Sequence, residues 1–210
     1  MRAMRMVLKS GRWHESRWTV NSRDTIMKTP VQAVDTVVED ADRWRILAVL
    51  LGVIFKATGA APLTTVPMKG EYSKMDFVRS ARFMGIPYNP PTRFPLPTQV
   101  AARAYYWLHE RDCGMARAFA KAVYRALFVD DRDVSDAAVV LELAAGVGAD
   151  RAGLAEGVES PEIKDRLRAE VASAIDKGVF GSPYIVCDGE AFFGADRLPQ
   201  LEARLAGKDF

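Results

Sequence analysis

Residues 178–197 read GVFGSPYIVCDGEAFFGADR, and this stretch indicates how the chain folds. Gly178 is expected to close a preceding helix, because a residue without a Cβ readily adopts the left-handed conformation that ends a last turn. The apolar run 184–187 predicts a strand, and the Asp-Gly pair at 188–189 supplies the two positive-φ positions of a tight hairpin turn. Residues 191–193 then return as the partner strand. The stretch therefore predicts a helix followed by a β-hairpin.

Pro183 follows Ser182 at the start of the first strand of this hairpin. A trans bond here would simply mark the edge of a strand. A cis bond would turn the backbone of Ser182 outward, so that its N–H and C=O could pair with a ligand that has a peptide backbone. Because only about one X-Pro bond in twenty is cis in folded proteins, the residues alone favour the trans form. Further along, Asp196 is expected to cap a closing helix over 197–206.

The composition excludes several classes of protein. The chain has 210 residues, of which 49% are hydrophobic, enough for one domain with an insertion. A net charge of +2, spread along the chain, gives no reason to expect a nucleic-acid partner. No apolar run is long enough to span a membrane.

The cysteines argue against a dithiol enzyme. Cys113 and Cys187 are the only two, and they do not form a C-x-x-C pair. Both are interpreted as small buried hydrophobes. The lack of a disulfide framework favours a reducing compartment, the cytoplasm.

The rest of the chain predicts one more strand and a series of helices. Residues 44–52 are interpreted as a buried strand ending at a glycine, and 53–59 as a short connector. Helices are expected over 72–83, over 99–111 after a Thr98 cap, around 119–128, and after a Ser135 cap. His109 is interpreted as a solvated surface histidine. The segment 88–97 is rich in proline and is expected to be extended.

A long helix is predicted to begin at Ser160-Pro161, with the cap and the first-turn proline in their preferred places. Its apolar positions recur every four residues on one face, at Ile163, Leu167, Val171 and Ile175. In contrast, residues 1–42 show neither helical nor alternating periodicity. For this atypical segment we expect disorder or a poorly packed extension.

Two motifs resemble one known family. GVFGSP with the Asp-Gly hairpin and FFGADRL, and the run LLGVIFKATG at 50–59, resemble the 2-hydroxychromene-2-carboxylate isomerases. These are DsbA-like members of the thioredoxin superfamily and relatives of the kappa-class glutathione transferases. The resemblance implies an α/β fold, in which a thioredoxin-like sheet (43–70 and 160–210) carries an inserted helical subdomain (71–159). The first β-α unit is expected to be absent or divergent.

The resemblance also implies a glutathione site. In the family the proline is cis, the residue before it pairs with the cysteinyl backbone of glutathione, and the Gly-x-Asp-Arg turn holds the γ-glutamyl end. By position these residues are Ser182, Pro183, Asp196 and Arg197. Family members usually carry an asparagine that contacts glutathione where this chain has Ala60, so that contact is lost.

Lys56 and Arg93 are candidates for binding the carboxylate of an aromatic acid substrate. Each is equally well explained as a solvated surface cation. No metal-ligand spacing exists, so no metal is expected. A homodimer is left open.

No catalytic residue is assigned. The family's reactive loop, an Asp-Phe-x-Ser-Pro-like run whose serine hydrogen-bonds the glutathione thiolate, has no counterpart in residues 1–42. An altered upstream reading frame and a divergent, inactive homologue explain this equally well. The leading function is a glutathione-dependent isomerase that interconverts 2-hydroxychromene-2-carboxylate and trans-o-hydroxybenzylidenepyruvate-type compounds in aromatic catabolism. The alternatives are a kappa-like glutathione transferase or thiol-disulfide oxidoreductase relative, and a catalytically dead glutathione-binding protein.

Overall fold

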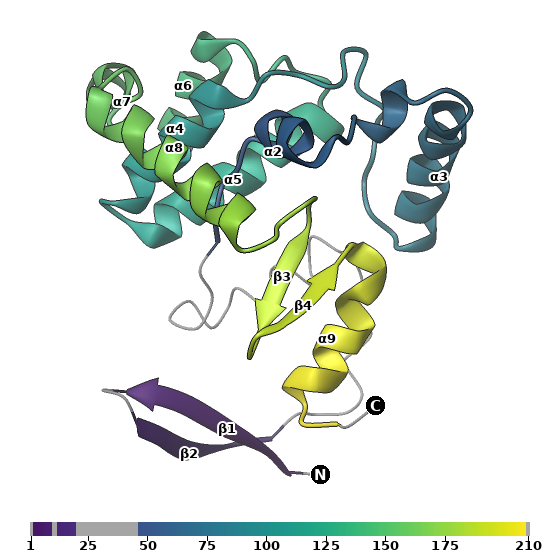
Figure 1. The fold of residues 1–210 in the computed structure, drawn as a ribbon. Helices are drawn as coiled ribbons and strands as arrows, with labels where there is room; N and C mark the ends of the chain where they lie inside the picture. The colour runs from purple at the N-terminus through teal and green to yellow at the C-terminus, as the bar shows by residue number, and fades with distance from the viewer. Residues whose placement is uncertain (1, 10–11, 20–45, 209–210) are drawn as a thin grey trace.

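A computed structural model describes residues 2–9, 12–19 and 46–208. The helices α2 to α8 form the upper part of the molecule in Figure 1, and the hairpin β3–β4 lies beneath them with α9. The elements in chain order are β1 (Arg2–Lys9), β2 (Arg12–Thr19), α2 (Leu51–Thr58), the 3-10 helix η1 (Leu63–Thr65), α3 (Lys69–Phe83), α4 (Gln99–His109), α5 (Cys113–Phe128), α6 (Ala137–Gly146), α7 (Arg151–Gly157), α8 (Pro161–Asp176), β3 (Tyr184–Cys187), β4 (Glu190–Phe193), the 3-10 helix η2 (Ala195–Arg197) and α9 (Leu198–Leu205).

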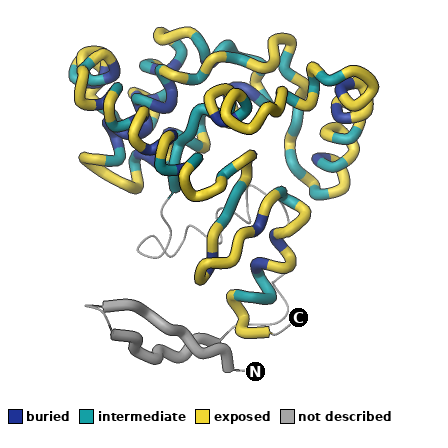
Figure 2. The backbone as a smooth tube through the Cα atoms, in the orientation of Figure 1, coloured by how far each residue is buried: buried dark blue, intermediate teal, exposed yellow. Residues whose placement is uncertain are grey.

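The main hydrophobic core surrounds α4. This helix is apolar around most of its circumference, so it lies inside the molecule, and α5, α6, α7 and α8 pack against it (Figure 2). The predicted stripe of α8 is confirmed at Ile163, Leu167 and Val171, which are buried, while Ile175 is partly buried. The cap of α8 is confirmed too, because the Ser160 hydroxyl accepts a hydrogen bond from the Ile163 N–H at 3.3 Å.

The C-terminal hairpin follows the sequence prediction. Asp188 and Gly189 have φ values of 50° and 84°, the two left-handed positions that the tight turn requires. Gly178, at φ 77°, follows the end of α8. One face of the hairpin forms a second, smaller core, where Cys187 and Phe192 pack on α9. The Ser182–Pro183 bond is cis, as the family resemblance implied.

The strand predicted over residues 44–52 is wrong in the part that the structure describes. Residues 46–50 form no regular element, and α2 begins at Leu51, where a strand and a connector had been expected. The carbonyl of Ile46 accepts a hydrogen bond from the Tyr105 hydroxyl at 3.0 Å, and that of Ala48 from the Tyr106 hydroxyl at 2.7 Å. Two side chains of α4 therefore satisfy carbonyls that a neighbouring strand would have paired. Among the described residues that follow β2, the only sheet is β3–β4.

Two predicted helix caps are also wrong. Thr98 makes no side-chain cap to α4. The cap of α6 is Asp136, whose carboxylate accepts from the Ala138 N–H at 2.8 Å. Ser135 is not free to cap, because its hydroxyl donates to Asp133.

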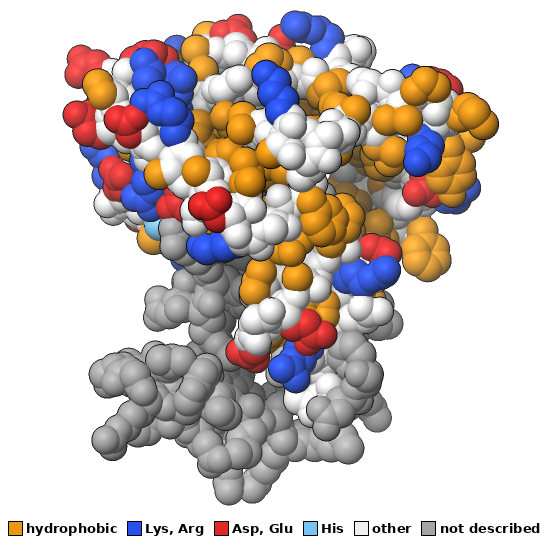
Figure 3. All heavy atoms as spheres, in the orientation of Figure 1, with side chains coloured by type: hydrophobic (Ala, Val, Ile, Leu, Met, Phe, Trp, Pro, Cys, Tyr) orange, Lys and Arg blue, Asp and Glu red, His pale blue; other side chains and the backbone are white. Residues whose placement is uncertain are grey.

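Helix α3 leaves several of its large apolar side chains exposed. Tyr72, Met75 and Phe83 are 57%, 64% and 91% exposed, and hydrophobic side chains gather over α3 in Figure 3. The helix instead contacts η1 through Gly70, where a Cβ would lie 2.5 Å from the Thr64 carbonyl oxygen. Close backbone packing at Gly70, rather than burial of these apolar side chains, decides which face of α3 is inside.

Within the N-terminal segment, β1 and β2 pair antiparallel in a register that runs from Arg2↔Thr19 to Lys9↔Arg12. The lack of clear periodicity did not predict this hairpin. The remainder of residues 1–42 lies outside the described residues, so the expectation of disorder there stays a prediction. The domain boundaries at 70 and 160 stay predictions as well. Over the described chain, no helix combines the length and the apolar character needed to cross a membrane.

Candidate functional site

Ser182 and Pro183 form an exposed corner at the start of β3. The Pro183 carbonyl accepts a hydrogen bond from the Gly194 N–H at 3.0 Å, which fixes the corner to the end of β4. No described residue hydrogen-bonds the backbone N–H or C=O of Ser182. These groups are therefore available to a ligand with a peptide-like backbone.

Asp196 and Arg197 lie at the same end of the hairpin, in η2. Arg197, not Asp196, is the N-cap residue of α9, so the predicted cap is wrong. The Asp196 carboxylate instead accepts from Arg197 Nη1 at 2.6 Å, and the two side chains are 73% and 47% exposed. This pair keeps a negative and a positive group side by side on the surface.

Gly194 brings these residues together. Its φ of 96° strongly favours glycine, and a Cβ at this position would lie 2.5 Å from Asp196 Oδ1. The residue thus binds Pro183 through its N–H and leaves room for the Asp196 carboxylate on its other side. Ser182, Pro183, Asp196 and Arg197 together are called the hairpin site below.

An aromatic cluster that the sequence analysis missed lies beside the hairpin site. The ring of Phe180 is 5.3 Å from that of Tyr184 and 4.6 Å from that of Phe193, between centroids. Phe180 and Phe193 are 46% and 44% exposed. Gly181 allows this packing, because a Cβ there would lie 2.4 Å from Phe193 Cε2. The only signal in the sequence was the placement of aromatic residues on both sides of the Ser-Pro pair.

Lys56 and Arg93 are not joined to the hairpin site by any hydrogen bond or ion pair among the described residues. Lys56 is exposed on α2. Arg93 forms an ion pair with Asp133, and Thr92 next to it donates its N–H to Asp131 at 2.8 Å. The pKa of Asp133 is lowered, chiefly because Ser135 donates hydrogen bonds to this carboxylate, with a smaller effect of Arg93. Of the two cations, Lys56 is therefore the one without a carboxylate partner in the described chain.

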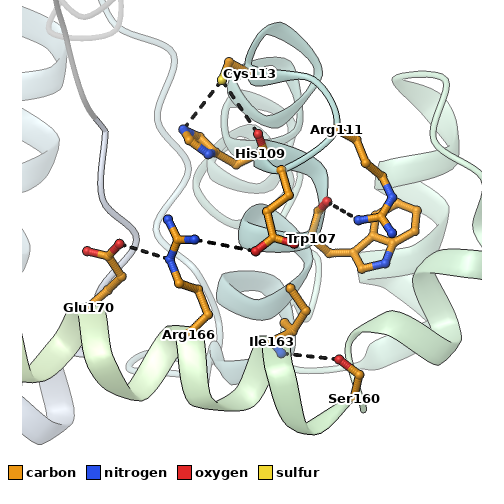
Figure 4. Close-up of polar contacts among 9 residues, drawn as sticks. Trp107, His109, Arg111, Cys113, Ser160, Ile163, Arg166 and Glu170 are labelled. Atoms are coloured by element: carbon orange, nitrogen blue, oxygen red, sulfur yellow. Dashed lines mark hydrogen bonds and ion pairs between the residues drawn. The ribbon is translucent and has the colours of Figure 1, made fainter.

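The two cysteines differ. Cys187 is buried, as expected, and burial raises the pKa of its thiol. Cys113 is exposed, so its interpretation as a buried hydrophobe is wrong. Its Sγ lies 3.7 Å from Nε2 of His109, which is half-buried rather than fully solvated (Figure 4).

A cavity of about 700 Å³ lies among the helices, away from the hairpin site. Its lining includes Trp107 of α4, Arg111 of the turn after α4 and Gly157 at the end of α7, but no residue of the hairpin. The guanidinium carbon of Arg111 lies 3.6 Å from the centre of the Trp107 ring and covers it (Figure 4). We place the candidate site at the hairpin, because the unpaired backbone groups of Ser182 and the charged pair Asp196–Arg197 lie at the same end of it.

Residues 42–206 match the family of the DSBA-like thioredoxin domain. The chain belongs to this family. The match begins where the atypical segment ends, and the predicted fold class, a thioredoxin-like α/β fold with a large helical part, is confirmed.

Proteins similar to this chain include an isomerase and glutathione transferases. A 2-hydroxychromene-2-carboxylate isomerase of Sphingobium xenophagum is 32% identical over 121 residues, which cover 56% of this chain and 60% of that protein. Glutathione S-transferase kappa 2 of Caenorhabditis elegans is 29% identical over 153 residues, covering 67% of this chain and 68% of the transferase. The solved structure of a 2-hydroxychromene-2-carboxylate isomerase superposes with a TM-score of 0.75 at 22% identity, covering 86% of this chain and 89% of that one. The family resemblance stated from the residues is therefore confirmed.

Proposed function

We propose that this protein binds reduced glutathione at the hairpin site and uses it to isomerise an aromatic acid of the 2-hydroxychromene-2-carboxylate type. The observation that carries the proposal is the free backbone of Ser182, held at the same end of the hairpin as the Asp196–Arg197 pair. The kinship with isomerases and kappa-class glutathione transferases supports it.

The residues of the hairpin site fit glutathione at two places. The tripeptide has a backbone that can pair with the N–H and C=O of Ser182, as an added strand does. Its γ-glutamyl end carries an ammonium and a carboxylate. Asp196 can accept from the ammonium and Arg197 can donate to the carboxylate, in charge-assisted hydrogen bonds that replace part of their mutual contact.

When bound, glutathione supplies a thiol that can add reversibly to a conjugated carbonyl compound and so permit rotation about the double bond. The chain's own part, in this proposal, is to hold and orient both molecules. The aromatic cluster of Phe180, Tyr184 and Phe193 offers apolar contact to the ring of the substrate, and Lys56 offers a cation for its carboxylate. None of the described residues is assigned to activate the thiol. A reducing, cytoplasmic location is part of the proposal.

A kappa-like glutathione transferase is the second candidate. The match to the Caenorhabditis elegans transferase extends over more of both proteins than the match to the Sphingobium isomerase. The two activities differ in their product, since an isomerase returns glutathione unchanged and a transferase consumes it.

Calorimetric titration of the full chain with reduced glutathione tests the site. We expect Asp196→Ala to weaken binding about tenfold, because one exposed charge-assisted hydrogen bond contributes about 1–1.5 kcal/mol. Asp165→Ala is the matched control: Asp165 is another exposed aspartate that pairs with a neighbouring arginine, Arg168, but on α8. It should bind glutathione like the wild type. Equal affinity of all three proteins, or no binding at all, would refute the assignment of the hairpin site.

Turnover then separates the functions. Absorbance spectroscopy of the aromatic acid, with and without glutathione, should show interconversion at constant glutathione concentration. Consumption of glutathione would indicate the transferase. Binding without any turnover would identify a glutathione-binding protein without catalytic activity and would contradict the isomerase.

A further inference from the structure

A thiol and an imidazole lie together at the junction of α4 and α5, on elements other than the hairpin. His109 is the last residue of α4 and Cys113 the first of α5. Cys113 Sγ is 3.7 Å from His109 Nε2, within the reach of a hydrogen bond to sulfur, and the thiol is exposed (Figure 4). The function proposed above uses neither residue.

The local fold holds the imidazole in place. The N–H of Asp112 donates to the Leu108 carbonyl at 2.8 Å, so the chain turns tightly from one helix into the next. On its other side, the His109 ring lies against the ring of Tyr105, with 5.7 Å between centroids. The Tyr105 hydroxyl is itself bound to the Ile46 carbonyl. His109 is thus restricted by packing, while Cys113 remains open to solvent.

Cys113 is the first residue of α5 and directly follows the N-cap residue Asp112, whose carboxylate accepts from the Met115 N–H at 2.9 Å. A thiol with a base within reach is the arrangement by which proteins activate a sulfur nucleophile.

We propose that Cys113 is a site of reversible thiol–disulfide exchange with small disulfides, and that His109 acts as its base. In the exchange, His109 takes the thiol proton and the Cys113 sulfur attacks one sulfur of the disulfide. The S–S bond breaks, a mixed disulfide forms on Cys113, and the second sulfur leaves as a thiolate that receives the proton. Cys113 is oxidised and the leaving half is reduced.

The second cysteine of the chain is an internal control. Cys187 is 8% exposed, lies beside Asp188, and packs on α9. Its burial hinders access by a disulfide, and the raised pKa of its thiol keeps it protonated. The two thiols should therefore react at very different rates in the folded protein.

The test is incubation of the full, reduced chain with glutathione disulfide at neutral pH, followed by mass spectrometry and peptide mapping over time. We expect one glutathionyl group, on Cys113, and its removal by a reducing agent. Replacement of the base by His109→Gln should slow the modification about tenfold, because an unassisted thiol is only a few per cent thiolate at pH 7. Cys113→Ser should abolish it. Circular dichroism checks that both variants fold.

A comparison within the wild type does not depend on any variant. In denaturing urea Cys113 loses its contact with His109, so it should react more slowly than in the folded chain, whereas Cys187 should react faster. Equal rates for Cys113 in the folded and unfolded chain, an unchanged rate in His109→Gln, or modification of Cys187 in the folded chain would each overturn the proposal.

Discussion

Gly157 at the end of α7 is the position where a single methyl group should do the most measurable damage. A Cβ built there would lie 2.0 Å from Nε1 and 2.1 Å from Cδ1 of Trp107. The Trp107 side chain has little freedom to move, because it is 7% exposed and the Arg111 guanidinium covers its ring. Gly157→Ala therefore forces either the ring or the end of α7 out of place.

Two opposing effects set the size of the change. An alanine in a helix restricts the unfolded chain and by itself stabilises a protein by about 0.4–1 kcal/mol. Forcing an extra methyl group into a packed core costs about 1–3 kcal/mol. With contacts as short as these the clash dominates, and we expect the free energy of unfolding to fall by about 1–2 kcal/mol.

Gly146→Ala is the matched control. Gly146 also ends a helix, α6, but beyond its chain neighbours and the backbone of its own helix no atom of the described chain lies within 4 Å of a Cβ built there. This variant should keep or slightly raise the stability. Urea unfolding followed by circular dichroism measures both, and Gly157→Ala should lower the midpoint by about 0.5–1 M, given a slope of about 2 kcal/mol per molar urea. If both variants shift the midpoint equally, the argument from the Trp107 contact is refuted.

Two further substitutions test the site and the helical core. Gly181→Ala should weaken glutathione binding in calorimetry, because the new methyl group pushes the ring of Phe193 out of the cluster beside the hairpin site. The variant should lose only about 1 kcal/mol of stability, because this half-exposed ring can turn away. Unchanged affinity would contradict a role of this packing in the site. Tyr106→Phe should cost about 1 kcal/mol at neutral pH, since it leaves the Ala48 carbonyl without its donor. Burial, and to a smaller extent the charge of Glu170, raises the pKa of Tyr106 in the folded protein. The hydroxyl therefore stays neutral in the folded chain at pH values where it would ionise in the unfolded chain. Its contribution to the free energy of unfolding is fully present below the ordinary tyrosine pKa of about 10 and is lost as the pH rises above it. Alkaline unfolding curves should therefore fall less steeply for the variant than for the wild type, and parallel curves would argue against this effect.

The sequence alone determined the elements that depend on local chemistry. The Asp-Gly turn, Gly178 after α8 and the Ser160 cap were all predicted and are present, because each depends on the backbone preference or hydrogen bonding of residues within one turn. The motifs at residues 50–59 and 178–198 also identified the family, and with it the cis bond before Pro183.

Other features depend on contacts between distant segments, which local patterns do not encode. Residues 46–50 have the composition of a buried strand, yet the hydroxyls of Tyr105 and Tyr106 bind two of their carbonyls, and the chain enters α2 directly. A run of apolar residues shows that a segment is buried, but the groups that satisfy its backbone decide whether it becomes a strand. For the same reason, only the tertiary structure joined the Gly194 N–H to the Pro183 carbonyl and placed the ring of Phe180 against that of Phe193.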